Sequence, residues 1–316
     1  MMTNACAQAK GADTPVLPSC PQIPHHPGMN YRHRFHAGNA ADCMKHLALV
    51  LSLAQLRQKD RPLYYVDTHA GAGRYDLTAG AEAEEGIQRL WPLRRELAEL
   101  RPWLDLLLPE NSGKSLTTYL GSPLLAAQLL RPQDPLFLVE KVPQMAQELR
   151  AALAGRSHSS ILVEDGYAFL RRMAPPAAGR GLVLVDPAFE AADEWERLAE
   201  SLLVANQHWP QASFLVWYPV KIRGKISRLL QHLQVQTALQ TIELLWEGDS
   251  GRERLIGSGL LLLRPVWGVA EAILAALGRM APLLALHGEW SVQMRAVPQR
   301  VRHPHPPTDT SGKRQK

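Results

Sequence analysis

The chain has 316 residues, of which 46% are hydrophobic and 21% are charged. A chain of this length and composition buries a sizeable core, in one large or two small domains. It contains no run of the ~20 apolar residues that a membrane-spanning helix requires, which excludes a protein of that class. The formal net charge of +5 fits a polyanionic partner without requiring one.

The two ends of the chain differ in composition from the rest. Residues 1–28 are rich in proline and lack both the basic start and the apolar centre of a secretory signal peptide, and residues 299–316 are basic. We expect both to be disordered extensions of a folded part at 29–298. Two of the three cysteines lie in the first extension, and no metal-ligand spacing is present. We therefore expect a cytoplasmic protein without disulfides or bound metal. We also expect it to act as a monomer.

The first predicted elements are a helix, a strand and a glycine loop. Residues 42–58 have apolar side chains at near 3.6-residue spacing, which predicts a helix with Asn39 or Asp42 as its N-cap. The β-rich run at 62–67 ends in a carboxylate. It leads directly into a loop with two glycines at 68–73, so a strand is expected to end at a glycine loop.

A long segment separates this loop from the next predicted strand. Residues from about 76 to 119 are rich in Glu, Leu and Arg and predict helices, but they are too many for a simple crossover, so we expect a small helical insertion. Strand-like runs then alternate with helical patterns, and the last two predict a C-terminal β-hairpin. This rhythm predicts an α/β fold, a doubly wound and mostly parallel sheet with helices on both faces. The later strands are expected at 136–140, 161–164, 182–186, 214–219, 241–246 and 259–264.

Carboxylates stand at the ends of the predicted parallel strands: Asp67, Glu140, Glu164 or Asp165, and Asp186. Ligands of doubly wound sheets bind outside these strand ends. Gly71 and Gly73 would allow the backbone to approach a nucleoside cofactor closely. Glu140 could then accept hydrogen bonds from ribose hydroxyls, and Asp165 could accept one from an adenine amino group. Because Asp76 replaces the third glycine of the dinucleotide fingerprint, a nicotinamide cofactor is disfavoured.

The tetrapeptide Asp186-Pro187-Ala188-Phe189 follows the Asp/Asn-Pro-Pro-aromatic signature of enzymes that methylate amines conjugated to a ring. Such an amine is a poor nucleophile because its lone pair is delocalised into the ring. Asp186 would accept one amine hydrogen and the carbonyl of Pro187 the other, so that the lone pair points at the methyl donor. Phe189 would stack on the base. A strand that ends in a proline turn, with Phe189 filling the core, is the alternative interpretation.

A series of short motifs runs along the chain: Tyr31-Arg32-His33-Arg34-Phe35-His36-Ala37-Gly38-Asn39, Asp42, Lys45-His46, Asp67-Thr68-His69-Ala70-Gly71-Ala72-Gly73-Arg74-Tyr75, Gly121-Ser122-Pro123, Leu138-Val139-Glu140, Asp165-Gly166, Asp186-Pro187, Trp217-Tyr218-Pro219 and Gly257-Ser258-Gly259. Their order and spacing closely resemble the RlmJ family of bacterial 23S ribosomal RNA adenine-N6 methyltransferases, over roughly 29–298. The resemblance implies a Rossmann-like methyltransferase domain, S-adenosylmethionine as the cofactor and 23S ribosomal RNA as the partner.

The resemblance also implies site residues. Asp186 would be the catalytic residue that accepts a hydrogen of the amine. Tyr31 would lie at the position where members of the family contact their RNA. Tyr31 belongs to a basic and aromatic cluster at 31–36 that suits unpaired bases, although a solvated basic turn is the alternative interpretation. Taken alone, His46 could be a surface histidine and Ser122 a helix N-cap. The implied cofactor-binding residues are His46, His69, Ser122, Glu140, Asp165, Gly166 and Asp186.

One position departs from the family pattern. Ala188 stands where the family has a second proline, so the restraint that a following proline would place on Pro187 is absent. Two other functions stay open. Because the tetrapeptide signature serves several kinds of amine, the same chemistry could act on an adenine in DNA or on a protein amide. The departure at Ala188 also makes a catalytically weak RNA-binding homologue conceivable.

Overall fold

The computed structural model describes residues 36–78, 82–175, 179–220, 223–246, 256–284 and 289–300. All of them belong to one unit of the chain, Tyr31–Lys316. Tyr31 itself, the extension at 1–28 and residues 301–316 lie outside the described residues. Within the described ranges, no helix is both long enough and apolar enough to cross a bilayer.

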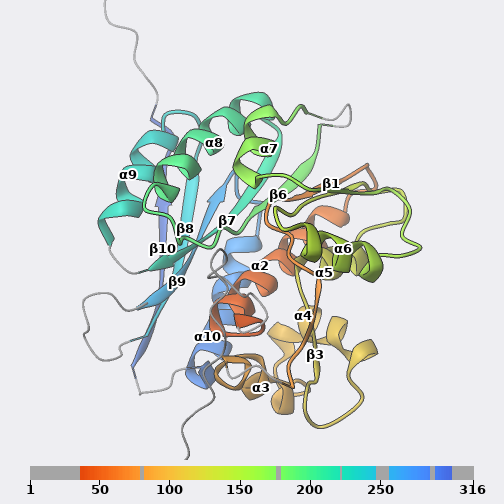
Figure 1. Ribbon diagram of the computed structural model, residues 1–316. Coiled ribbons are helices and arrows are strands. Elements are labelled where there is room, and N and C mark those ends of the chain that lie inside the picture. The colour runs from red at the N-terminus through yellow and green to blue at the C-terminus, as the bar shows by residue number, and fades with distance from the viewer. Residues whose placement is uncertain are drawn as a thin grey trace, which may run out of the picture. The chain divides into compact units, whose positions relative to one another are not determined.

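Helices and strands alternate along most of the described chain (Figure 1). The described residues contain the α-helices α2 (Ala40–Arg57), α3 (Ile87–Leu90), α4 (Arg101–Leu104), α5 (Ser122–Leu129), α6 (Pro143–Ala152), α7 (Gly166–Arg172), α8 (Glu194–His208), α9 (Arg223–Leu233) and α10 (Val269–Leu284). The strands are β1 (Tyr64–Asp67), β2 (Arg74–Asp76), β3 (Thr118–Leu120), β4 (Leu136–Val139), β5 (Ser159–Leu162), β6 (Gly181–Val185), β7 (Ala212–Val220), β8 (Leu239–Trp246), β9 (Gly257–Leu263) and β10 (Trp290–Val297).

Among the described residues, eight strands form one sheet in the order β10-β8-β9-β7-β6-β1-β4-β5. The strands from β5 to β7 in this order are parallel, whereas β9, β8 and β10 each run antiparallel to the strand before them. The chain order reverses between β1 and β6, and this reversal is the topological switch point at which such sheets bind ligands. The expected α/β fold with a doubly wound, mostly parallel, Rossmann-like sheet is confirmed.

Helices cover both faces of this sheet. In β6, Leu182 and Leu184 join one hydrophobic cluster, while Val183 and Val185 join another. Because successive side chains of a strand point to opposite faces, an uninterrupted apolar strand needs cover on both sides. Figure 1 shows α7, α8 and α9 on one face and α2 and α10 on the other.

The helix α2 carries polar side chains into the interior. It begins at Asn39, whose side-chain oxygen accepts a hydrogen bond from the N–H of Asp42 at 2.9 Å, so Asn39 and not Asp42 is the N-cap. The next turns bury Asp42, Lys45 and His46 together with their apolar neighbours. Charged groups in such positions need partners, and Lys45 pairs both with Asp42 in the same helix and with Asp186 beside the switch point.

The strands β2 and β3 pair antiparallel and frame the insertion expected at about 76–119. In its described residues, Trp91 and Trp103 are fully buried. The N–H of Ile87 donates to the carbonyl of Gly38 at 2.8 Å, which fixes the insertion against the start of α2. Besides α3 and α4, the segment contains the 3-10 helices η1 (Glu82–Glu85), η2 (Trp91–Leu93), η3 (Ala98–Leu100) and η4 (Asp105–Glu110).

One edge of the sheet differs from the sequence prediction. β8 and β9 pair as the expected antiparallel hairpin, but β10 adds to β8 as a further edge strand. Most side chains of β10 are exposed, among them Trp290 and Met294. A strand with solvent on most of its side chains has no alternating apolar pattern, so the sequence does not reveal it.

Candidate active site

A carboxylate lies at or just after the end of each of four parallel strands, as the sequence predicts. Asp67 is the last residue of β1, and Glu140 and Asp186 directly follow β4 and β6. Asp165 follows β5 and caps α7. Since β1 and β6 flank the switch point, Asp67 and Asp186 lie on either side of the position where a ligand of this fold binds.

The loop after β1 depends on glycine. Gly71 and Gly73 have φ angles of 65° and 79°, in the left-handed region that side chains disfavour. A Cβ on Gly71 would lie 2.2 Å from the hydroxyl oxygen of Tyr75, and a Cβ on Gly166 would lie 2.2 Å from the carbonyl oxygen of Thr68. Glycine at these two positions therefore allows the start of α7 and the Tyr75 hydroxyl to pack directly against the loop.

Glu140 is tied to the glycine loop. One carboxylate oxygen accepts from the N–H of Gly71 at 2.8 Å, and the other accepts from the N–H of Val142 at 2.7 Å. Burial raises the pKa of Glu140 above its ordinary value, although these backbone donors oppose the shift. A carboxylate fixed in this place is a suitable acceptor for the hydroxyls of a ribose.

Asp165, and not Glu164, is the acid at the end of β5 that belongs to the site. Glu164 forms an ion pair with Arg172 on α7. Oδ1 of Asp165 accepts from the backbone of α7, while Oδ2 lies 2.8 Å from Arg197. Burial alone would raise the pKa of Asp165, but the backbone N–H of Ala168 and the Arg197 guanidinium outweigh burial and hold that pKa below its ordinary value.

His69 lies in the same loop as an uncharged side chain. Its Nδ1 is 2.8 Å from the Thr68 hydroxyl, and its ring contacts Tyr167 edge-on at 5.4 Å. The pKa of His69 is lowered to about 4, mainly by loss of hydration and also by the cations Arg197 and Lys141, which act against the pull of Asp165. The imidazole is therefore neutral near pH 7.

His69 should make the protein less stable in mild acid. In the unfolded chain it takes up a proton near pH 6.5, whereas the folded chain resists until about pH 4. Above pH 6.5 the neutral ring makes its full contribution to the free energy of unfolding. This contribution is lost as the pH falls toward 4, and for this partly accessible side chain the loss is about 2 kcal/mol. Urea unfolding of wild type and His69→Gln across this range should show a smaller loss in the variant. Parallel curves would contradict the assignment.

Ser122 does not cap α5. The cap residue is Gly121, and Ser122 begins the helix with its side chain buried. Its hydroxyl instead hydrogen-bonds the carboxyl group of Asp67, which also accepts from the Tyr65 hydroxyl at 2.9 Å. Burial raises the pKa of Asp67, while these two hydroxyls and the N–H of His69 oppose the rise.

His46 is not a surface histidine. It is buried in α2, and its Nδ1 lies 2.6 Å from the hydroxyl of Tyr119 on β3. The structure thus gathers the predicted cofactor-binding residues on the loops and helices around β1. Their contacts with a cofactor remain a prediction.

Lys45 is the central residue that the sequence interpretation missed. Its ammonium group contacts the carboxylate of Asp42 at 2.6 Å and also forms an ion pair with Asp186. The Lys45 and Asp42 side chains are each 5% exposed and that of Asp186 is 13% exposed, so water screens these pairs little. A lysine three residues after an aspartate in the largely apolar first half of a helix was the available signal, because such a segment buries charges only when they are paired.

The turn after Asp186 is held by aromatic packing. Phe189 has a φ of 54°, a left-handed conformation that is strained for a bulky residue. Its ring packs on Trp195 at 4.8 Å and on Trp217 at 5.9 Å between centroids. Pro187 is buried. Strain maintained by packing at this position is typical of a functional site.

The donor set at the switch point fits S-adenosylmethionine. Gly71 and Gly166 let the glycine loop, Tyr75 and the start of α7 pack closely together, and Glu140 and Asp165 hold carboxylate oxygens at the strand ends that could accept from a ribose and an adenine. The neutral ring of His69 does not repel a sulfonium. In the ranges the structure describes, no group of three or more His, Cys, Asp or Glu side chains is placed to hold a metal ion.

Comparison with known proteins gives a consistent result. The model of the family described as "RsmJ: Ribosomal RNA large subunit methyltransferase D, RlmJ" matches residues 60–296. Ribosomal RNA large subunit methyltransferase J from Escherichia coli (strain K12) is 36% identical over 251 residues, which cover 77% of this chain and 89% of that protein. The protein of the same name from Haemophilus influenzae is 31% identical over 275 residues, 84% of this chain and 98% of that protein.

A solved structure agrees in fold. The crystal structure of protein LPL1258 from Legionella pneumophila superposes with a TM-score of 0.75 at 29% sequence identity, covering 83% of this chain and 98% of that one. The family match includes the glycine loop and every strand of the large sheet up to Ala296 in β10. The chain therefore belongs to the RlmJ family of ribosomal RNA large subunit methyltransferases.

Proposed function

We propose that this chain is an S-adenosylmethionine-dependent methyltransferase that methylates N6 of an adenine in 23S ribosomal RNA. The family membership supports the substrate class, since the relatives from E. coli and H. influenzae are named as large-subunit ribosomal RNA methyltransferases. The observation that carries the reaction is the position of Asp186. It stands at the switch point, paired with Lys45 and followed by Pro187 and a strained Phe189.

The side chains of this turn would prepare a conjugated amine for attack. When bound, S-adenosylmethionine supplies an electrophilic methyl group on a sulfonium. Asp186 would accept one hydrogen of the amine and the Pro187 carbonyl the other, which directs the nitrogen lone pair out of the base plane. As N6 gains the methyl group it gives up one proton, and Asp186 accepts it. Lys45 fixes the carboxylate for this work through their ion pair.

His46, His69, Ser122, Glu140, Asp165 and Gly166 would bind the cofactor on the β1, β4 and β5 side of the switch point, and Phe189 would pack on the base from the β6 side. Tyr31, which lies outside the described residues, would contact the RNA. In this proposal, the methyl donor would lie on one side of the switch point and the adenine on the other. We further propose that the protein works as a monomer in the cytoplasm, where its RNA is assembled into ribosomes.

Methyl transfer from labelled cofactor to ribosomal RNA, DNA and protein, measured in parallel, tests the proposal. We expect label in large-subunit RNA only, and mass spectrometry should find one N6-methyladenine that is lost from cells lacking the protein. Label in DNA or in a protein amide would assign the same chemistry to another substrate. If no fraction is labelled, even after Ala188→Pro restores the family proline, the chain is an RNA-binding homologue without activity.

A further inference from the structure

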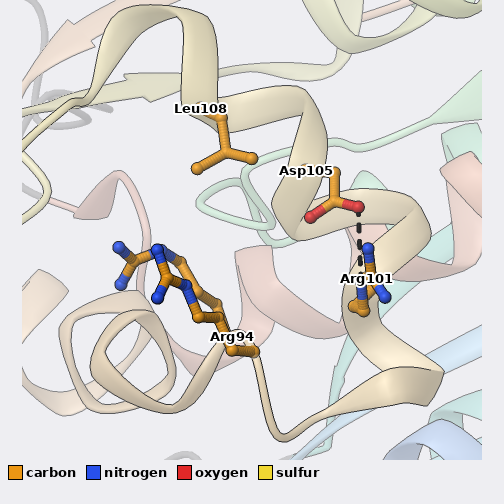
Figure 2. A pocket seen from close by; sticks show the side chains of 5 residues that line it. Arg94, Arg101, Asp105 and Leu108 are labelled. Atoms are coloured by element: carbon orange, nitrogen blue, oxygen red, sulfur yellow. Dashed lines mark ion pairs between the residues drawn. The ribbon is translucent and has the colours of Figure 1, made fainter.

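The helical insertion carries a basic groove that the proposed chemistry does not use. A cavity of about 350 Å³ is lined by Arg94, Arg95, Arg101, Asp105 and Leu108, which we call the arginine groove (Figure 2). The described part of the insertion contains more Asp and Glu than Lys and Arg. Three guanidinium groups against one carboxylate are therefore a local concentration of positive charge and not a consequence of composition.

The Arg94 side chain is fixed by two contacts with Trp91. Its guanidinium carbon lies 4.4 Å from the centroid of the Trp91 ring, and its Nη1 donates to the Trp91 carbonyl at 2.8 Å. Trp91 is fully buried. A guanidinium fixed in this way loses less conformational freedom when it binds an anion than a mobile one does.

The other side of the groove comes from the segment that follows. Figure 2 shows the ion pair between Arg101 and Asp105, with a separation of 3.5 Å. The two side chains are 60% and 47% exposed, so this pair is weak and competing anions can replace it. Leu108 is 43% exposed and adds an apolar surface beside the three cations.

The groove has a fixed position relative to α2. The N–H of Ile87 bonds the carbonyl of Gly38, and the Asn39 side chain donates to Glu82 at 3.0 Å. Trp91 and Trp103 pack in the same hydrophobic cluster as the first turns of α2. Since α2 also carries Lys45, a ligand in the groove is held in a constant relation to the active site.

We propose that the arginine groove binds phosphate groups of the substrate RNA, away from the adenine that is methylated. This inference rests on the proposed function, which makes RNA the substrate. Guanidinium groups bind phosphate through paired hydrogen bonds, and contacts to the RNA backbone set affinity and register while leaving base choice to the active site. Leu108 supplies a contact for a ribose or a base face.

RNA binding by the full chain tests the groove. The probe is a fluorescent transcript of large-subunit ribosomal RNA that contains, in unmethylated form, the adenine that the wild-type protein methylates. For Arg94→Gln/Arg95→Gln/Arg101→Gln at ~0.1 M salt, we expect Kd to rise on the order of 10- to 100-fold, and the slope of log affinity against log salt to decrease by about 2. Turnover at saturating RNA and the affinity for S-adenosylmethionine should stay within about 2-fold of wild type. Arg95→Gln/Arg101→Gln, which leaves the Trp91 contact intact, should show most of the change.

Matched variants exclude a general charge effect. Arg89→Gln/Lys114→Gln removes two cations of the same insertion that do not line the groove, and should bind RNA as wild type does. Asp105→Asn should bind RNA more tightly. Equal loss in this control pair, or unchanged RNA affinity in the triple variant, would overturn the inference. Competition by polyglutamate as strong as that by RNA would instead assign the groove to an acidic protein. Failure of the proposed function is seen separately, as absence of methyl transfer to RNA by wild type.

Discussion

Replacing Asp186 by alanine is expected to lower turnover at least ~100-fold, equivalent to about 3 kcal/mol of barrier stabilisation. The variant lacks both the acceptor that aligns the amine and the group that takes its proton. It also removes one partner of Lys45, which then keeps its contact with Asp42. The measurement is a single-turnover assay of methyl transfer to the RNA transcript, so that product release does not mask the chemical step.

Cofactor affinity separates loss of chemistry from loss of the site. Calorimetry should show that Asp186→Ala still binds S-adenosylmethionine, though more weakly, because Glu140 and Asp165 are unchanged. Asp186→Asn keeps the shape and one acceptor oxygen but cannot take the proton, so its turnover should also fall. Glu190→Ala, an exposed acid in the same loop, should behave as wild type. Turnover of Asp186→Ala above a tenth of wild type would remove Asp186 from the catalytic role.

The parts of the fold that the sequence predicts are those with a strong local pattern. β6 is a continuous apolar run that is directly followed by Asp186, so both its burial and the position of the acid follow from the sequence. Gly71 and Gly73 adopt left-handed conformations that few residues other than glycine tolerate. Local patterns of this kind are enough to predict the doubly wound sheet, the hairpin and the acids at the strand ends. The family assignment made from the same motifs is confirmed.

Features set by distant contacts could not be predicted in this way. β10 is defined by pairing with β8, and its exposed side chains carry no strand pattern. The role of Ser122 depends on Asp67, which is far from it in sequence. Likewise, the local pattern of α2 indicates that Lys45 is buried near Asp42, but the sequence does not say that Asp186 approaches from the sheet. The pairing exists only once α2 packs across the switch point.

Replacing Lys45 by methionine is expected to lower the free energy of unfolding by about 3–5 kcal/mol. The variant keeps the volume of the side chain but takes away the cation that lies between two poorly hydrated carboxylates. Desolvated carboxylates near one another repel, and the loss of a shared counter-charge costs more than an exposed ion pair contributes. Urea unfolding followed by circular dichroism measures the difference.

A second substitution shows whether charge is the cause. Lys45→Met/Asp42→Asn removes one of the two carboxylates as well, so it should regain part of the lost stability, whereas a packing defect at position 45 would persist in both variants. Lys59→Met, an exposed residue just after α2, should change stability by less than ~0.5 kcal/mol. The double variant should nevertheless remain slow in methyl transfer, because Asp186 still lacks the ammonium group that orients it. Recovery of stability without recovery of turnover would thus separate the two roles of Lys45, whereas recovery of both would show that it acts on stability alone.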